Sequence, residues 1–242
     1  MEKREQLYEG KAKVIFATDN PDLLIQYFKD DATAFNGVKK GTITDKGVVN
    51  NLVAGKLMTI LDAVGIPVHF VRQLNDREQL IRRVEIIPVE VVIRNVVAGS
   101  MARRLGLDEG QQLPRPILEF YYKADALDDP LVIRDHVLVF GWATEDELHW
   151  IETTCRRIND VLIAFFANIG IRLVDYKLEF GRLHGEVGKV VLADEISPDT
   201  CRLWDLTTGE KLDKDRFRRD LGGVVEAYQE VARRMGVTSK TS

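Results

Sequence analysis

Residues 173–181 have the sequence Leu-Val-Asp-Tyr-Lys-Leu-Glu-Phe-Gly, in which apolar and charged side chains alternate. Successive side chains of a strand point to opposite faces of its sheet, so Asp175, Lys177 and Glu179 would share one face. Taken alone, such a face is explained equally well as a solvated surface whose charges pair with one another. The stretch therefore predicts a strand and leaves the role of its charged face open.

The segment that follows changes this balance. We expect residues 171–183 and 188–196 to form a β-hairpin. Its register would place Asp194 opposite Asp175, with Glu195 next to it. Clustered carboxylates repel one another unless a cation neutralises them, and hard oxygen ligands suit Mg²⁺ that is held together with substrate phosphates. A magnesium site is therefore the favoured interpretation of the charged face.

The composition excludes several classes of protein. Of the 242 residues, 45% are hydrophobic and 30% are charged, as in an ordinary globular enzyme. The net charge of −4 argues against a nucleic-acid binder, which needs a basic excess. No apolar run approaches the roughly 20 residues that span a bilayer, and none follows residues 1–5 as in a signal peptide. We expect a cytoplasmic protein with Cys155 and Cys201 as free thiols, bound to neither nucleic acid nor membrane.

Periodicity along the chain predicts an α+β fold. Strands are expected in a hairpin over residues 7–18 with its turn near Glu9-Gly10, and over residues 23–28 and 66–72. Residues 80–97, rich in β-branched side chains, predict two strands joined at Pro88, and we expect the hinge between two lobes there. Apolar spacing predicts helices over residues 47–64, 144–168 and 214–235, the second opened by the capping box Thr144-x-x-Glu147.

A glycine turn near the start of the chain carries two lysines. Residues 8–13 have the sequence Tyr-Glu-Gly-Lys-Ala-Lys, and Gly10 in a turn lets backbone approach a ligand closely. Lys11 and Lys13 would share one strand face, which suits nucleotide phosphates. The motif is weak on its own, because most Gly-Lys turns are merely exposed.

Residues 94–104 combine an arginine with a strand-to-helix junction. Free N–H groups, the Ser100 hydroxyl and the Arg94 guanidinium would together form an anion site. The same residues are explained equally well if Ser100 caps the helix and Arg94 pairs with a surface acid. Further along, Pro198 makes the loop after the acidic hairpin rigid and would bring Asp199 and Arg202 close to it.

Other catalytic motifs are absent from the sequence. It contains no Walker A motif, no Gly-x-Gly-x-x-Gly run and no nucleophile elbow. An ATP-using enzyme with this sequence must therefore bind phosphates by another route. His69 and His136 lie in apolar or mixed runs, which are more typical of core or surface positions than of catalysts.

Five stretches together resemble the SAICAR synthetase family (phosphoribosylaminoimidazole-succinocarboxamide synthases). They are YEGKAK at residues 8–13, IPVEVVIRNVVAGS at 87–100, LVDYKLEFG at 173–181, DEISPDTCRLWD at 194–205 and DRFRRDLGG at 215–223. The similarity covers about residues 7–237, and the third and fourth stretches are its most specific part. It implies a two-lobed fold, distantly ATP-grasp-like and protein-kinase-like. ATP would lie between a β-rich nucleotide-binding lobe, residues 1–84, and a larger α/β lobe, residues 85–242, with the metal and substrate sites.

The resemblance also implies which residues bind the nucleotide and the metal. The ATP site would comprise Lys11, Lys13, Arg82, Val84 and Glu179, with adenine against the backbone of the hinge near Arg82–Val84. The Mg²⁺ site would comprise Glu179, Asp194, Asp175 and Asp45. Relatives often have glutamate in place of Asp45, so this residue departs from the family pattern.

The implied reaction joins L-aspartate to 5-amino-1-(5-phosphoribosyl)imidazole-4-carboxylate (CAIR). ATP would activate the CAIR carboxylate as an acyl phosphate, giving SAICAR, ADP and phosphate. The CAIR site would comprise Arg94, Ser100, Arg202 and Lys123, with Asp125 also near the substrate. The catalytic residues would be Lys177, Asp175 and Asp199. Lys177 and Asp199 would orient CAIR, and either Asp175 or Asp199 would take the amine proton.

The resemblance further implies the short bacterial form with one function, usually a homodimer.

Two other functions stay open from the residues alone. A small-molecule kinase with the same two lobes would need Lys11, Glu179 and Asp194, but no aspartate site. A catalytically silent nucleotide-binding module would be expected to lack at least one of the metal-site acids.

Overall fold

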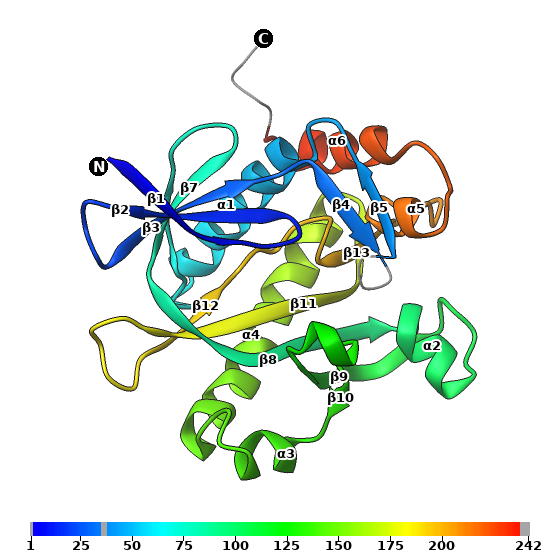
Figure 1. Cartoon of the computed structure of the whole chain (residues 1–242). Coiled ribbons are helices and arrows are strands. Elements are labelled where there is room, and N and C mark those ends of the chain that lie inside the picture. Colours follow the sequence, from blue (N-terminus) through cyan, green and yellow to red (C-terminus); the bar gives the residue numbers. More distant parts are fainter. Residues whose placement is uncertain (1, 35–37, 238–242) are drawn as a thin grey trace.

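Two antiparallel sheets meet at Arg83 in this computed structural model, which describes residues 2–34 and 38–237 (Figure 1). The first sheet has five strands in the order β1-β2-β3-β7-β6. Their bounds are Lys3–Glu9 for β1, Lys13–Thr18 for β2, Leu23–Phe28 for β3, Glu78–Arg82 for β7 and Phe70–Gln73 for β6. A separate two-stranded hairpin of β4 (Asp31–Ala34) and β5 (Lys39–Thr42) lies beside this sheet.

The second sheet has six strands, and β11 (Ile171–Leu183) lies at its centre. On one side β11 pairs with β8 (Val84–Val96), and β9 (Gln112–Tyr122) and β10 (Leu131–Val132) continue the sheet beyond it. On the other side the two halves of β11 pair with β13 (Cys201–Asp205) and β12 (Val190–Ala193). The strand with the charged face is thus paired along both edges.

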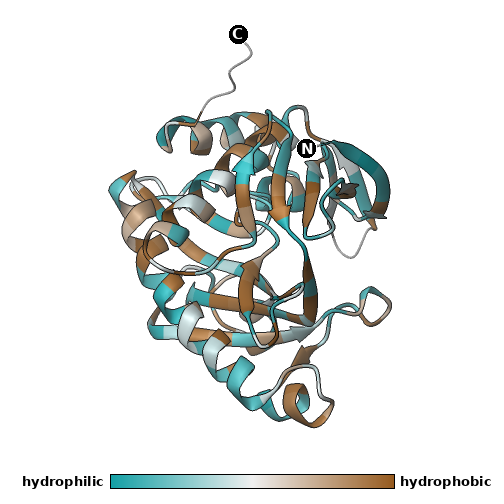
Figure 2. Ribbon diagram, turned by 90° about the vertical axis from the view of Figure 1, so that its left-hand side faces the viewer, coloured by the Kyte–Doolittle hydropathy of each residue, from teal (hydrophilic) through white to brown (hydrophobic). Residues whose placement is uncertain are grey.

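Helices cover the outer faces of the sheets. α4 (Glu145–Asn168) packs against β11 with a buried stripe that includes Ile151, Cys155, Ile158 and Leu162, spaced three or four residues apart. α1 (Lys46–Ala63) contacts the first sheet and α6 (Val224–Arg234). The shorter helices are α2 (Gly99–Leu105), η1 (Asp125–Leu127), α3 (Arg134–Val139) and α5 (Asp215–Arg218). Figure 2 shows hydrophobic residues along the strands in the middle of the molecule.

The expected α+β class is confirmed, and several elements match their sequence signals. Thr144 begins α4 as predicted, because its hydroxyl accepts from the Glu147 amide at 3.2 Å and its own amide donates to the Glu147 carboxylate at 2.9 Å. α1, β3 and the hairpin of β11 and β12 also form where we expected them. Among the described residues, no helix has both the length and the apolar character needed to cross a membrane.

The predicted break at Pro88 is wrong. The chain leaves the first sheet at Arg83, and Pro88 lies inside β8. The proline is tolerated because a register shift between Glu179 and Gly181 on β11 interrupts the ladder opposite it. The division into residues 1–84 and 85–242 stays a prediction; the passage from β7 to β8 lies next to it.

Two further boundaries differ from the predictions. The helix expected over residues 214–235 is two helices, α5 and α6, because Asp220, Gly222 and Gly223 adopt left-handed backbone angles that end the first helix and begin the second. The strand expected over residues 66–72 begins at Phe70. Before it, Val68 makes only an isolated bridge to Leu192.

Two glycines of α1 provide a matched test of this packing. A Cβ at Gly47 would lie 2.4 Å from the Phe28 carbonyl oxygen, whereas a Cβ at Gly55 would meet nothing closer than 3.5 Å. We predict that Gly47→Ala lowers the free energy of unfolding by about 1–3 kcal/mol, since backbone must move. Gly55→Ala should leave it unchanged or raise it by up to about 1 kcal/mol, since alanine favours a helix. Urea unfolding of both variants checks this, and equal stability would contradict the packing.

Candidate functional site

Alternation along β11 places Asp175, Lys177 and Glu179 in one row, as the sequence predicts. On the neighbouring strand β8, Arg94 lies opposite Asp175 and Glu90 lies opposite Glu179. Asp175 and Glu179 are only 3% and 6% exposed. The charged face is therefore not a solvated surface, and its charges must be neutralised by neighbouring groups.

At the Glu179 end, three lysines surround three carboxylates. We call this group the lysine–carboxylate cluster; it comprises Lys13, Glu90, Lys123, Lys177, Glu179 and Asp194. The Lys177 ammonium lies 2.6 Å from one oxygen of Glu179 and 2.9 Å from Glu90. Lys123 lies 2.8 Å from the other oxygen of Glu179.

Lys13 and Asp194 complete this cluster. Lys13, the first residue of β2, forms an ion pair with Asp194 and lies 3.0 Å from Glu195. The Lys177 ammonium lies 3.7 Å from the other oxygen of Asp194. Lys13 therefore connects the first sheet to the segment that follows β12.

Mutual neutralisation keeps these buried groups charged. Burial opposes ionisation of Glu179, but the charges of Lys177 and Lys123 outweigh it and lower the pKa of this carboxyl. Burial likewise opposes ionisation of Asp194, and Lys13 and Lys177 lower its pKa. Burial also disfavours the charged form of Lys177, yet Glu179 and Asp194 raise its pKa well above the usual value. At neutral pH the cluster holds anionic and cationic groups in direct contact.

At the Asp175 end, two arginines meet one carboxylate. The Nη1 atoms of Arg94 and Arg202 lie 2.8 Å and 2.9 Å from the same oxygen of Asp175. Arg94 also donates to Glu119 at 2.7 Å and to the Ser100 hydroxyl at 2.9 Å. We call Arg94, Glu119, Asp175, Arg202 and Asp215 the arginine cluster.

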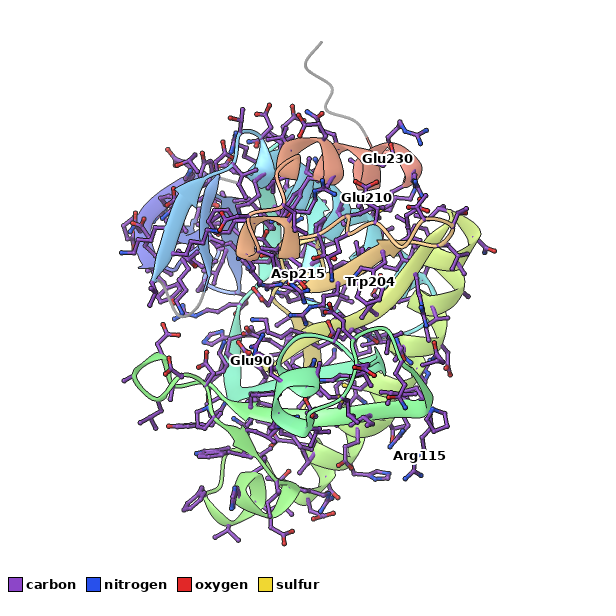
Figure 3. The ribbon with its side chains drawn as sticks, turned by 90° about the vertical axis from the view of Figure 1, so that its right-hand side faces the viewer. Glu90, Arg115, Trp204, Glu210, Asp215 and Glu230 are labelled. Atoms are coloured by element: carbon purple, nitrogen blue, oxygen red, sulfur yellow. The ribbon has the colours of Figure 1, made fainter. Side chains whose placement is uncertain are left out.

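Arg202 retains one unbonded edge in this cluster. Its Nε atom donates to Asp215 at 3.0 Å, but among the described residues its Nη2 atom has no hydrogen-bond partner. Gly99 adopts φ +54°, and a Cβ there would lie 2.3 Å from Nη2, so only glycine leaves room for this guanidinium. Figure 3 shows Asp215 and Glu90 in the central part of the molecule, where these clusters lie.

A third group surrounds Asp199 in the loop between β12 and β13. The Asp199 carboxylate accepts from the buried Lys46 ammonium at 2.8 Å and from the Tyr228 hydroxyl at 2.5 Å. Lys214 lies 3.5 Å from it. Burial opposes its ionisation, but Lys214 and Lys46 lower the pKa of Asp199, which makes it a weak base.

The predicted opposition of Asp194 and Asp175 is wrong. Glu179 pairs with Ala193, while Asp175 lies opposite Arg202 of β13. Both Asp175 oxygens accept hydrogen bonds from arginines. Asp175 therefore does not lie opposite Asp194, and its carboxylate is bound by Arg94 and Arg202.

Two other predicted placements also need correction. Asp45 precedes α1, and its carboxylate lies 3.5 Å from Arg77, so it does not join the lysine–carboxylate cluster. Lys11 and Lys13 do not share a strand face, because Lys11 belongs to the turn before β2. The Lys11 ammonium instead lies 2.7 Å from the carboxylate of Asp125, the first residue of η1.

The hinge backbone is partly occupied by internal bonds. The amide of Arg82 donates to the His69 carbonyl at 2.7 Å, and that of Arg83 donates to the Asp22 carbonyl at 2.8 Å. The predicted contact of adenine with Arg82 and Val84 stays a prediction. The amides of Arg82 and Arg83 already donate within the protein, so adenine would not bind to them.

The lysine–carboxylate cluster suits a magnesium ion that arrives with phosphates. Among the described residues no three His, Cys, Asp or Glu side chains converge as a closed metal site. Mg²⁺ is typically bound through one or two carboxylates together with substrate phosphates, so a closed set is not required. The negative charge of Asp194 opposes ionisation of Glu179, and the lysines nearby suit the phosphates.

One family of known proteins is similar in sequence to this chain. The sequence model of the SAICAR synthetase family matches residues 6–235. The chain belongs to this family. The phosphoribosylaminoimidazole-succinocarboxamide synthase of Magnetococcus marinus is 68% identical to it, over 98% of each chain.

Solved structures of the family have the same fold as this chain. The crystal structure of phosphoribosylaminoimidazole-succinocarboxamide synthase from Ehrlichia chaffeensis is similar with a TM-score of 0.96 and 51% identity, over 98% of this chain and 100% of that one. A SAICAR synthetase in complex with ADP has a TM-score of 0.91 and 46% identity, over 96% of this chain and 97% of that one. The two-lobed fold class predicted from the sequence is therefore confirmed.

Several residues of the site have no role predicted from the sequence. They are Glu90, Glu119, Lys46, Lys214, Asp215 and Tyr228. Glu90 had a readable signal, because it lies two positions from Val92 and four from Arg94 on one strand and so shares the face of Arg94. Lys46 gave no such signal, because its role depends on how α1 packs against the loop of Asp199.

Proposed function

We propose that this chain is the ATP-dependent ligase that condenses CAIR with L-aspartate to give SAICAR, ADP and phosphate in purine biosynthesis. The observation that carries this proposal is the charged face of β11. It places an arginine cluster and a lysine–carboxylate cluster side by side on one strand. CAIR carries a phosphate at one end and a carboxylate at the other, so it requires two such neighbouring sites.

The arginine cluster is assigned to the 5′-phosphate of CAIR. The Nη2 atom of Arg202 and the Ser100 hydroxyl would donate hydrogen bonds to this phosphate, and Arg94 would contribute positive charge close to it. Residues 175 and 179 are separated by about 13 Å along a strand, a distance on the scale of a ribonucleotide. Lys177, halfway along, would orient the carboxylate of CAIR, and Lys123 lies beside it.

The lysine–carboxylate cluster is assigned to the ATP phosphates and Mg²⁺. Glu179 and Asp194 would hold the ion, while Lys13 from β2 and Lys11 in the preceding turn would bind phosphate oxygens. When bound, Mg²⁺ neutralises part of the phosphate charge. The lysines that now neutralise the two carboxylates would then be released to the phosphates, so the site stays electrically balanced.

Amide formation requires activation of the CAIR carboxylate, because carboxylate oxygen is a poor leaving group. We propose that a carboxylate oxygen of CAIR attacks the γ-phosphorus of ATP and that ADP leaves. The aspartate amine then attacks the acyl carbon, phosphate leaves, and the amine proton passes to water. In such a reaction the protein mainly positions groups and neutralises charge. Asp199 would orient CAIR rather than accept the amine proton, since its low pKa makes it a weak base.

We also propose a cytoplasmic homodimer. Both cysteines are buried free thiols, which a reducing compartment preserves. Ile133, Val139 and Phe140 are 58%, 79% and 64% exposed, an apolar surface that a second copy would cover. Light scattering after size exclusion would measure the mass, and a monomer at micromolar concentration would contradict this part.

The central test of the proposed function follows labelled oxygen. CAIR carrying ¹⁸O in its carboxylate should deliver one labelled oxygen into inorganic phosphate per turnover, because that oxygen leaves with the phosphoryl group. Omitting aspartate should stop phosphate release. A small-molecule kinase would form ADP without aspartate and keep its phosphate on the product. Unlabelled phosphate with SAICAR still forming would rule out the acyl phosphate.

The metal assignment is tested at Glu179 and Asp194. Glu179→Gln and Asp194→Asn should nearly abolish turnover, and raising Mg²⁺ should restore part of it, since each loses one charged ligand. Glu85→Gln is the control, because this glutamate lies on β8 but is 78% exposed. Activity near the wild-type level in either variant at low Mg²⁺ would move the metal elsewhere.

The phosphate assignment is tested with Gly99, the first residue of α2, and Gly106, which directly follows α2. Gly99→Ala and Gly106→Ala share the strain of a positive φ, but only a Cβ at Gly99 would strike Arg202, while that at Gly106 meets open space. We predict that Gly99→Ala raises the KM for CAIR about tenfold or more, as expected for a weakened charged hydrogen bond. Its KM for ATP should stay the same, and Gly106→Ala should change neither. A selective rise in the KM for ATP would reassign Arg202.

A further inference from the structure

Asp194 has an unusual backbone conformation for a residue other than glycine. It directly follows β12, and its φ of +59° lies in the left-handed region. This conformation costs free energy for residues that carry a Cβ, although aspartate tolerates it better than most. The turn directs the carboxylate toward Lys13 and Lys177. Surrounding groups must therefore hold this backbone in place.

His69 supplies one such contact. Its Nε2 atom lies 3.0 Å from the carbonyl oxygen of Asp194, and the residue is 2% exposed. A carbonyl oxygen only accepts hydrogen bonds, so Nε2 carries the proton and donates it.

The backbone of His69 is bonded on both sides as well. Its amide donates to the Leu192 carbonyl of β12 at 2.8 Å, and its carbonyl accepts from the Arg82 amide at the end of β7 at 2.7 Å. One residue thus touches the strand before Asp194, Asp194 itself and the passage between the two sheets. Because the residue is only 2% exposed, its side chain is not available to substrate.

We propose that His69 is a positioning residue, which fixes the backbone turn at Asp194 and thereby aims the Asp194 carboxylate at the metal–nucleotide site. This inference rests on the proposed function, because it takes Asp194 as a ligand of the Mg²⁺–nucleotide. It assigns His69 no contact with substrate. The role needs an N–H donor of suitable reach and does not need an imidazole.

The experiment compares His69→Leu with His69→Gln. Leucine fills a similar space without a donor, whereas the glutamine amide restores one. Two quantities are measured: the rise in melting temperature that ADP causes with and without Mg²⁺, and the Mg²⁺ concentration for half-maximal turnover. Loss of a group that orients a metal ligand typically costs about 10–100-fold in metal affinity or activity. His136→Leu, at an exposed histidine of α3, is the matched control.

The proposal predicts a selective defect. His69→Leu should lose most of the Mg²⁺-dependent part of the thermal shift and need about tenfold more Mg²⁺, with an unchanged KM for CAIR. His69→Gln and His136→Leu should behave like the wild type. A wild-type Mg²⁺ response in His69→Leu, or an equal rise in every KM, would overturn the inference.

Two further outcomes are also decisive. If His69→Leu does not fold, His69→Asn replaces it, because its shorter amide does not reach the carbonyl; equal behaviour of the Asn and Gln variants would overturn the inference. If the wild type itself shows neither turnover nor a Mg²⁺-dependent response to ADP, the proposed function fails, and this inference fails with it. A changed Mg²⁺ response in the His69 variants, with a normal response in the wild type, shows which of the two proposals is at stake.

Discussion

Buried charges of opposite sign neutralise one another along one face of β11, and the rest of the site depends on this balance. Asp175 holds two arginines together at one end, and Glu179 lies between two lysines at the other. Removing one member of such a pair leaves an uncompensated buried charge, which costs about 3–5 kcal/mol. Under the proposed function, a polyanionic substrate with its metal ion would replace these partners, so that no buried charge is left unpaired.

This balance is built by segments that are distant in sequence. Lys13 reaches the cluster from the first sheet, and Lys46 reaches Asp199 from the helix that packs beneath that sheet. The loop between β12 and β13 receives both lysines. The two sheets are thus connected at the site by ion pairs as well as by the chain at Arg83. Ligand binding that rearranges these ion pairs would therefore affect both sheets.

The sequence predicted well what local signals determine. The start of α4 follows from a capping box, and the shared face of Asp175, Lys177 and Glu179 follows from the alternation of a strand. The register between β11 and β12 was wrong, because it depends on β13 occupying the first half of β11, which no local signal reveals. The family resemblance supplied further roles that stay predictions, and it assigned Asp175 to the metal, although in the fold two arginines bind this residue.

A crystal structure with CAIR and Mg²⁺–ADP tests the central claim most directly, because it locates every phosphate relative to β11. The account predicts the CAIR phosphate within hydrogen-bond distance of Arg202 Nη2 and Ser100 Oγ, and its carboxylate beside Lys177. The metal ion would then lie between Glu179 and Asp194, with Asp175 still bound to its two arginines. A CAIR phosphate bound at Lys13 and Lys123, or a metal ion at Asp175, would contradict it.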